Sequence, residues 1–333
     1  MPLSDAQIAR ALDAKTKPPG SLGRLETLAA RIARFKDSLT PTIETATLLL
    51  FAADHGIAAG GVSAYPQTVT RQMLVNFLDG GAAATVIARS VGVEVRIVDA
   101  GVAGEAIAHP ALISRRIAAG TRNSAIEPAM GQAECDAALA IGRELAEAAP
   151  GDAICLGEMG IGNSSAAALV GAKLLGRTVG DLVGPGTGVD AAGLDRKRAV
   201  LAGAASRTDP LLPSGAALRE YGGFEIVMMA GAAIGAAATG RIVIVDGFIA
   251  TAAALAASKL EPASRDAVVF AHRSAEPGHR LLLDHLGAEP LLDLGMRLGE
   301  GTGALLAWPL VKAAAAMLRE MATFEDAGVS GRN

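Results

Sequence analysis

Aromatic residues and cysteines are scarce in this sequence of 333 residues. Phe, Trp and Tyr together account for 3%, although hydrophobic residues as a whole account for 51%. Alanine and glycine must therefore fill much of the interior, so we expect backbones that approach one another closely. The two cysteines, Cys135 and Cys155, lie twenty residues apart without a CxxC motif. This excludes a disulfide framework and is typical of a reducing, cytoplasmic protein.

Long apolar segments and basic segments are also missing. The longest uncharged apolar run, residues 226–240, has fifteen residues, fewer than the ~20 that a membrane-spanning helix requires. The first ten residues, MPLSDAQIAR, contain no apolar core of a signal peptide. The formal net charge is -4, and no basic block or alternation of aromatic and basic residues occurs. We therefore expect neither a membrane span nor a nucleic-acid partner.

Short aliphatic runs that end in polar or glycine residues predict a parallel β-sheet. Five such runs occur, at residues 46–56, 93–101, 152–160, 241–248 and 266–272. Alanine-rich helical segments lie between them, at residues 69–90, 132–148, 163–175 and 250–258. Strands that alternate with helices at this spacing indicate a sheet buried on both faces. The predicted fold class is α/β, either doubly wound or barrel-like.

Both ends of the chain are predicted to be helical. Residues 5–14 and 23–35 form two helices, separated by a helix-breaking Pro-Pro-Gly, and residues 303–321 form a third. We expect residues 1–40 and 303–333 to pack together as a small helical lobe. Residues 41–302 then form a large parallel-sheet catalytic domain.

The predicted strand ends carry most of the residues suited to chemistry, and ligands bind at the carboxyl ends of open parallel sheets. The polar residues at these ends are Asp54, His55, Asp99, Glu158, Asp246 and His272. One strand runs into GEMGIGNSS (157–165), which opens a helix, and GPGTG (184–188) lies nearby. Uncovered glycine amides at a helix start suit a bound phosphate. The alternative for the first loop is an ordinary glycine turn capped by Asn163, Ser164 or Ser165.

Several nucleotide and metal signatures are absent from the sequence. No Gly-Lys dipeptide occurs, which excludes a Walker A loop. The first predicted strand lacks a GxGxxG turn, which disfavours a dinucleotide-binding protein. The five histidines form no HExxH motif and no close cluster with cysteine. We therefore expect no bound metal and no cofactor.

Two charged residues each allow a structural and a functional interpretation. Glu300 stands among three glycines within GMRLGEGTGALLAW (295–308). It either stabilises the start of the following helix, with Thr302 as the N-cap, or serves as a base in a binding site. Lys197 lies in the charged segment AAGLDRKRAV (191–200). This segment is typical of a solvated helix face, and contact of one charge with a phosphate is the alternative.

Eight longer strings occur in order along nearly the whole chain. They are KPPGSLGRLE (17–26), ADHGIAAGGVSAYPQTVTRQM (53–73), GEMGIGNSS (157–165), GPGTG (184–188), YGGFEIVMMAGA (221–232), VDGFIATAAAL (245–255), AHRSAEPGH (271–279) and LDLGMRLGEGTGA (292–304). Together they resemble the nicotinate-nucleotide–dimethylbenzimidazole phosphoribosyltransferase family, which builds the lower ligand of cobalamin. Several of the strings are long and specific, which argues against chance agreement.

The resemblance implies a reaction, a fold and an assembly. The family moves the 5-phosphoribosyl group of nicotinate mononucleotide onto 5,6-dimethylbenzimidazole, and the products are α-ribazole 5′-phosphate and nicotinate. We expect inversion at C1′ with a glutamate as general base. The implied fold is a Rossmann-like doubly wound parallel sheet with a smaller helical lobe from both termini, assembled as a homodimer. A nucleotide N-glycoside hydrolase, or a non-catalytic protein that binds a ribotide or a benzimidazole, is the alternative.

The resemblance also implies roles for individual residues. The catalytic glutamate of the family's LGEG motif corresponds to Glu300. The residues implied for the ribosyl phosphate are Glu158, Gly160, Lys197, Ser274 and Arg297. The residues implied for the benzimidazole pocket are Gln67, Met159 and Leu298. Benzimidazole, adenine and phenolic acceptors are flat and similar in size, so the preferred acceptor stays open.

Overall fold

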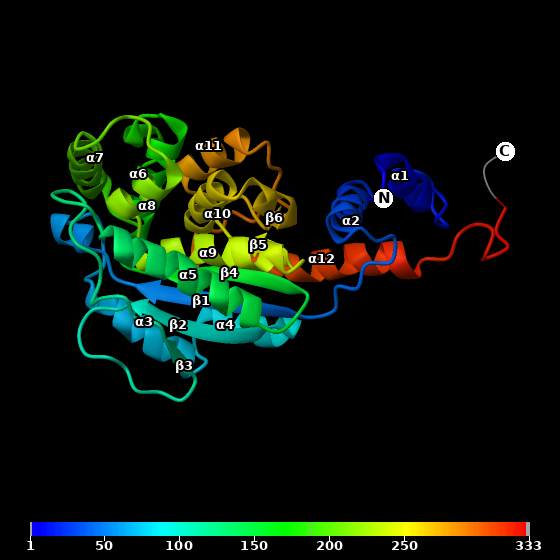
Figure 1. The fold of residues 1–333 in the computed structure, drawn as a ribbon, viewed down its shortest axis with the longest axis horizontal. Helices are drawn as coiled ribbons and strands as arrows, with labels where there is room; N and C mark the ends of the chain where they lie inside the picture. The colour runs from blue at the N-terminus through cyan, green and yellow to red at the C-terminus, as the bar shows by residue number, and fades with distance from the viewer. Residues whose placement is uncertain (1, 187, 331–333) are drawn as a thin grey trace.

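A computed structural model describes residues 2–186 and 188–330, and a six-stranded parallel sheet forms their centre (Figure 1). The strands are β1 (Ala46–Ala53), β2 (Glu94–Gly101), β3 (Leu112–Ser114), β4 (Ala153–Met159), β5 (Ile242–Val245) and β6 (Val268–Phe270). Their order is β3-β2-β1-β4-β5-β6, and every pair of neighbours runs parallel. This is the order of a doubly wound, Rossmann-like sheet, so the predicted fold class is confirmed.

Both faces of the sheet are buried, which explains the continuous aliphatic runs in the sequence. All eight residues of β1 are buried. Leu49 and Phe51 contribute to one apolar core, whereas Leu48 and Leu50 contribute to the other. The five strands expected from the sequence are present. Strand β3 was not expected, because its three residues are exposed or half-buried and form no apolar run.

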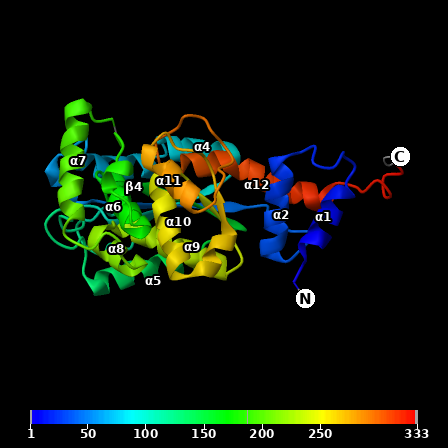
Figure 2. The ribbon, with the colours of Figure 1, turned by 90° about the horizontal axis from the view of Figure 1, so that it is seen from above.

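Helices cover both faces of the sheet (Figures 1 and 2). They are α1 (Asp5–Asp13), α2 (Arg24–Lys36), α3 (Thr68–Leu78), α4 (Ala83–Val91), α5 (Gln132–Ala148), α6 (Asn163–Leu175), α7 (Ala191–Ala205), α8 (Ser214–Tyr221), α9 (Phe224–Ala238), α10 (Phe248–Leu260), α11 (Pro277–His285) and α12 (Thr302–Glu320). Short 3₁₀ helices are η1 (Gly56–Gly60), η2 (Val179–Asp181) and η3 (Pro262–Ala267). Helices α9 and α10 pack on one face, and α3, α4 and α12 pack on the other.

The segment predicted as a single helix at residues 69–90 consists of two helices, α3 and α4. The chain turns between them at Gly80, which has a φ of 76°. A Cβ at Gly81 would lie 2.6 Å from the side-chain oxygen of Asn76. These two glycines therefore break the helix, and the break directs the first turn of α4 toward the carboxyl ends of the strands.

The terminal helices lie together at one end of the molecule, where α2 packs against α12 and α1 packs against α2 (Figures 1 and 2). The Lys15 ammonium group donates a hydrogen bond to the Met321 carbonyl at 2.7 Å. One apolar core continues from Ile32 of α2 through α12 to Leu48 of the sheet. Because α12 packs on both the terminal helices and the sheet, the division into a lobe and a large domain stays a prediction.

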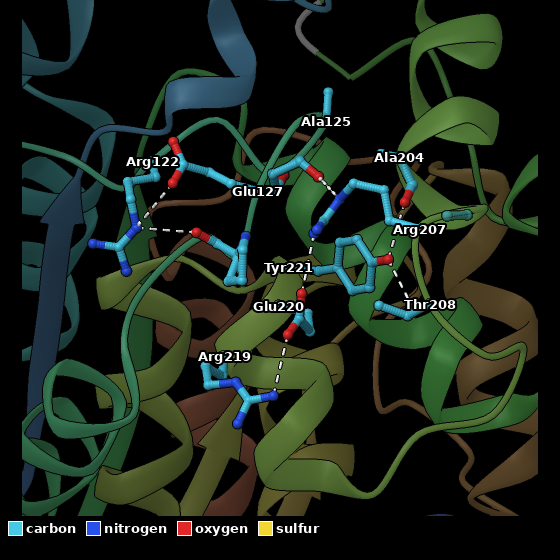
Figure 3. A network of polar contacts seen from close by, with 12 residues as sticks. Arg122, Ala125, Glu127, Ala204, Arg207, Thr208, Arg219, Glu220 and Tyr221 are labelled. Atoms are coloured by element: carbon cyan, nitrogen blue, oxygen red, sulfur yellow. Dashed lines mark hydrogen bonds and ion pairs between the residues drawn. The ribbon is translucent and has the colours of Figure 1, made fainter.

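A polar network fastens the C-terminal end of α7 to α8 (Figure 3). The guanidinium groups of Arg207 and Arg219 each lie 3.1 Å from a different carboxylate oxygen of Glu220. The Tyr221 hydroxyl donates a hydrogen bond to the Ala204 carbonyl at 2.9 Å. These contacts fix α7, the helix that carries one of the predicted phosphate contacts.

Glycines allow α5 and α9 to approach closely, as the composition led us to expect. A Cβ at Gly142 of α5 would overlap the Met228 carbonyl, and a Cβ at Gly231 of α9 would overlap the Leu139 carbonyl. Helix α9 contains most of the fifteen-residue apolar run and is buried in the core. Among the helices of residues 2–186 and 188–330, none has the length and apolar character needed to cross a membrane.

We expect Gly142→Ala to destabilise the fold by about 1–3 kcal/mol, because the added methyl group must force two helix backbones apart. Gly203→Ala in α7 is the matched control, since a Cβ there meets nothing within 4 Å. That control should raise the free energy of unfolding by about 0.5–1 kcal/mol, the usual difference between glycine and alanine in a helix. Urea unfolding measures both variants. Equal free energies of unfolding would contradict the close packing of α5 and α9.

Candidate active site

A cavity of about 740 Å³ opens at the carboxyl ends of β4 and β5, as expected for a doubly wound sheet. Its walls come from the strand ends, α3, the start of α6 and the loop before α12. Its acidic residues are Glu158, Asp246, Glu276 and Glu300, and its apolar residues include Val69, Met73, Met159, Phe248 and Leu298. In the part of the chain that the structure describes, no three or more of the His, Cys, Asp and Glu side chains are placed so that they could hold a metal ion together.

Most of the site residues predicted from the sequence lie together in this cavity. Those that line it are Glu158, Met159, Gly160, Ser274, Arg297, Leu298 and Glu300. Lys197 lies behind the wall, where it is 1% exposed and donates a hydrogen bond to the Ser164 hydroxyl at 3.0 Å. Ser164 itself lines the cavity. Gln67 is exposed and donates to the His55 carbonyl at 3.5 Å, two residues from Tyr65, which does line the cavity.

The backbone at Glu300 adopts a conformation that is rare for a residue with a side chain. Gly299, Glu300 and Gly301 have φ angles of 85°, 61° and 78°. Glycine adopts such angles freely, whereas a glutamate in this region is strained by about 1–3 kcal/mol. Strain of this kind persists only where the surroundings fix the backbone, and it is concentrated at functional sites.

Glu300 is 5% exposed, and its carboxyl group faces α4 and the cavity. It accepts a hydrogen bond from the Ala84 amide, in the first turn of α4, at 3.4 Å. Burial raises the pKa of Glu300, the Ala84 amide opposes this rise, and the nearby Asp246 carboxylate adds to it. The N-cap of α12 is Gly301, so the prediction of Thr302 as the N-cap is wrong. Glu300 therefore bonds to α4, and not to the helix that follows it.

The glycines around Glu300 let its loop pack directly against the strand ends. A Cβ at Gly157 of β4 would lie 2.8 Å from the Glu300 carbonyl oxygen. A Cβ at Gly301 would lie 3.1 Å from the Gly157 Cα, and one at Gly303 would overlap the His272 ring. A side chain at any of these positions would therefore displace Glu300 from the cavity.

Known proteins match this chain over almost its whole length. A family model described as phosphoribosyltransferase matches residues 3–329. The nicotinate-nucleotide–dimethylbenzimidazole phosphoribosyltransferase of Variovorax paradoxus is 53% identical and covers 98% of this chain and 94% of its own. The protein of the same name from Cupriavidus necator is 52% identical, over 99% of this chain and 97% of its own. The crystal structure of CobT from Thermus thermophilus superposes with a TM-score of 0.95 at 46% identity, covering 98% of this chain and 99% of its own.

The chain belongs to the nicotinate-nucleotide–dimethylbenzimidazole phosphoribosyltransferase family. The resemblance inferred from the eight sequence strings is thereby confirmed. The similarity runs from the first helix to the C-terminal segment, so it includes every element that lines the cavity.

In this member of the phosphoribosyltransferase family, Glu158 is a second buried acid beside Glu300. Burial raises the pKa of Glu158 well above its ordinary value, and the carboxylates of Asp246, Glu225 and Glu300 add to the rise. The Asn163 side-chain amide donates a hydrogen bond to Glu158. This environment favours the protonated carboxyl group, which can both donate and accept a hydrogen bond.

The start of α6 lies beside the loop at residues 184–188, of which Thr187 is outside the described residues. The N-cap of α6 is Gly162 and no side chain caps this helix, so the alternative interpretation of the loop as a turn capped by Asn163, Ser164 or Ser165 is wrong. Arg297 donates a hydrogen bond to the Gly186 carbonyl at 2.9 Å. Burial lowers the pKa of Lys197 to about 8. The interpretation of Lys197 as part of a solvated helix face is therefore wrong.

Two further buried acids were not identified from the sequence, one in the cavity wall and one on α9. Glu276 lines the cavity, and neither of its carboxylate oxygens has a hydrogen-bond partner of normal geometry within the described residues. Burial raises the pKa of Glu276, while Lys197 and the Gly186 amide oppose this rise. Glu225 pairs with His55 at 2.6 Å, and both side chains are fully buried. The signal available for Glu225 was its position as a lone acid directly before the apolar run at residues 226–240.

Burial of Glu300 predicts a stability penalty that depends on pH. The raised pKa means that the folded protein binds this proton more tightly than the unfolded chain does. The free energy of unfolding therefore falls as the pH rises from the unfolded pKa through the folded pKa, and the penalty is complete above the latter. We expect Glu300→Gln to be more stable than the parent at pH 8, by about 1.4 kcal/mol for each unit by which the pKa is raised.

The gain in stability should shrink as the pH falls and vanish where an exposed glutamate is protonated. Urea unfolding at several pH values measures this difference. Glu320→Gln is the matched control, because Glu320 is an exposed acid at the opposite end of α12. A gain that is the same at every pH would show that burial does not raise the pKa of Glu300.

Proposed function

We propose that this protein transfers the 5-phosphoribosyl group of nicotinate mononucleotide to 5,6-dimethylbenzimidazole in the biosynthesis of the cobalamin lower ligand. The products are α-ribazole 5′-phosphate and nicotinate. Family membership supports this activity, since relatives at 53% and 52% identity carry the name of this transferase. The observation that carries the proposal is a buried carboxyl group with a raised pKa, Glu300, in a cavity whose wall combines apolar side chains, other acids and Arg297.

The reaction requires one base and no general acid. The ring nitrogen of nicotinate mononucleotide is already cationic, so the bond from C1′ to this nitrogen breaks with its electron pair and leaves a neutral ring nitrogen. One nitrogen of dimethylbenzimidazole forms the new bond to C1′ from the opposite face, which inverts C1′ and gives the α-anomer. The other nitrogen loses its proton during the same displacement. Glu300 accepts that proton, because a raised pKa brings a carboxylate closer to working pH.

The remaining side chains of the cavity suit the binding of the two substrates. Lys197, Ser274 and Arg297 are proposed to hold the phosphate, together with amides at the start of α6. Glu158 and Gly160 are proposed to contact the ribosyl group. Met159 and Leu298 lie in the cavity wall and supply apolar surface for the flat acceptor, and Gln67 is proposed to act from the rim near Tyr65. We also propose a cytoplasmic homodimer, in keeping with two buried cysteines that form no disulfide.

Release of nicotinate from nicotinate mononucleotide tests the proposed function. A transferase releases nicotinate rapidly only when dimethylbenzimidazole is present. A hydrolase would release it without any acceptor, and a binding protein would release none. Proton NMR of the product should show the α-anomer, and a β-linked product would require a covalent intermediate that the proposal does not contain.

In the same assay, Glu300→Gln should fold normally and lose about 10²–10⁴-fold in turnover, the usual contribution of a general base. The loss should appear in kcat more than in KM, because the proton is removed during the displacement. The parent's rate should fall at low pH as Glu300 is protonated, and this limb should disappear in the variant. Glu320→Gln should retain parental turnover. A Glu300→Gln variant with more than about a tenth of parental turnover would contradict the role of Glu300 as the base.

A further inference from the structure

We infer that Asp246 is a positioning residue, which holds the Glu300 backbone in the conformation that aims its carboxyl group into the cavity. The inference rests on the proposed transferase activity and adds a function for a side chain that none of the predicted roles includes. Asp246 follows β5, lines the cavity and is 2% exposed.

Three backbone amides of the loop and of α12 converge on the Asp246 carboxylate. One oxygen accepts hydrogen bonds from Gly303 at 2.6 Å and from Ala304 at 3.2 Å. The other oxygen accepts the Gly301 amide at 3.2 Å. Gly301 is the residue directly after Glu300, so this bond fixes one side of the strained residue. Because both oxygens are occupied by backbone amides, Asp246 is better suited to hold the loop than to bind a substrate.

The strained conformation of Glu300 needs contacts of this kind. A glutamate with a φ of 61° is less stable than one in an ordinary conformation by about 1–3 kcal/mol, and this cost has to be offset by the surroundings. The Gly157 backbone of β4 supports the loop from one side by close contact. Asp246 supports it from β5, and a carboxylate at the start of α12 also interacts favourably with the helix dipole. The loop is thus fixed between two neighbouring strands.

Asp246 also changes the charge around the base. Its carboxylate raises the pKa of both Glu300 and Glu158. The titratable groups that face it are Cys155 and Glu158 of β4, Glu300 of the loop and His272, whose ring nitrogen lies 3.5 Å away. A substitution that removes the Asp246 charge therefore lowers the pKa of Glu300. A substitution that keeps the charge and disturbs only the hydrogen bonds to the backbone amides leaves this contribution to the pKa in place.

A simpler role for Asp246 is that of a helix cap with no influence on catalysis. A cap contributes about 0.5–2 kcal/mol to stability wherever it lies. Asp152 is the control for a carboxylate that only holds backbone amides, because it accepts the amides of Glu44 at 2.8 Å and Thr45 at 3.1 Å, directly before β1. Asp152 lies before β4, at the opposite edge of the sheet from the cavity. The two aspartates therefore share a structural function and differ in their distance from Glu300.

The test compares Asp246→Asn, Asp246→Glu and Asp152→Asn in the nicotinate-release assay with saturating substrates. Asparagine keeps one acceptor oxygen and removes the charge, whereas glutamate keeps the charge and moves it by one methylene group. Both Asp246 variants should lose about 10- to 100-fold in kcat with little change in KM, as expected for a misplaced catalytic group. The acidic limb of the kcat profile should move to lower pH in Asp246→Asn and stay in place in Asp246→Glu. Asp152→Asn should keep the kcat of the parent, and its kcat should fall at the same low pH as that of the parent.

A double variant separates positioning from a general loss of structure. In the Glu300→Gln background, Asp246→Asn should change the residual rate by less than about threefold, because no base remains to be positioned. The inference would be overturned if the falls in kcat of the two single variants multiplied in the double variant. It would also be overturned if Asp246→Asn had the same kcat as Asp152→Asn and the same fall of kcat at low pH. If one Asp246 variant fails to fold, the other still reports the loss in kcat. An inactive parent would refute the proposed function itself, whereas an active parent with unaffected Asp246 variants would refute only the inference.

Discussion

The structure depends on contact between two backbones, where the loop that carries Glu300 lies on the end of β4. A Cβ at Gly157 would lie 2.8 Å from the Glu300 carbonyl oxygen, so no side chain fits between strand and loop. This contact places the Glu300 carboxyl group at the carboxyl edge of the sheet and against the first turn of α4. The opening of the cavity, the start of α12 and the strained backbone of Glu300 all follow from it.

The same contact forces several acids together in a buried space. Glu158, Asp246 and Glu300 line one cavity, and each of the two glutamates has a raised pKa to which Asp246 contributes. Repulsion between buried carboxylates opposes folding, and so does the backbone strain at Glu300. Close packing of α5 on α9 and of the sheet on its two layers of helices offsets both costs. A destabilised site in a tightly packed scaffold is common in enzymes, because a base needs an environment that does not favour its charge.

The sequence was sufficient to predict the sheet and the site loops, and much less informative about burial. Apolar runs identified five strands, because parallel strands buried on both faces leave a continuous pattern. The pattern did not show the turn at Gly80 between α3 and α4, nor the three-residue edge strand β3. The charged neighbours of Lys197 are typical of a solvated helix face, yet its side chain is buried and donates a hydrogen bond to Ser164. Its burial depends on tertiary packing, which no local pattern contains.

A titration of Glu300 alone decides whether burial prepares this residue to act as a base. Infrared spectra of the parent and of Glu300→Gln are recorded across a pH titration without substrate. The difference between the two proteins isolates the carboxyl band of Glu300. We expect this band to disappear, as the carboxylate forms, at a clearly higher pH than the band of a solvent-exposed glutamate. Ionisation at or below the pH of an exposed glutamate would contradict the claim that burial beside Asp246 prepares Glu300 to act as a base.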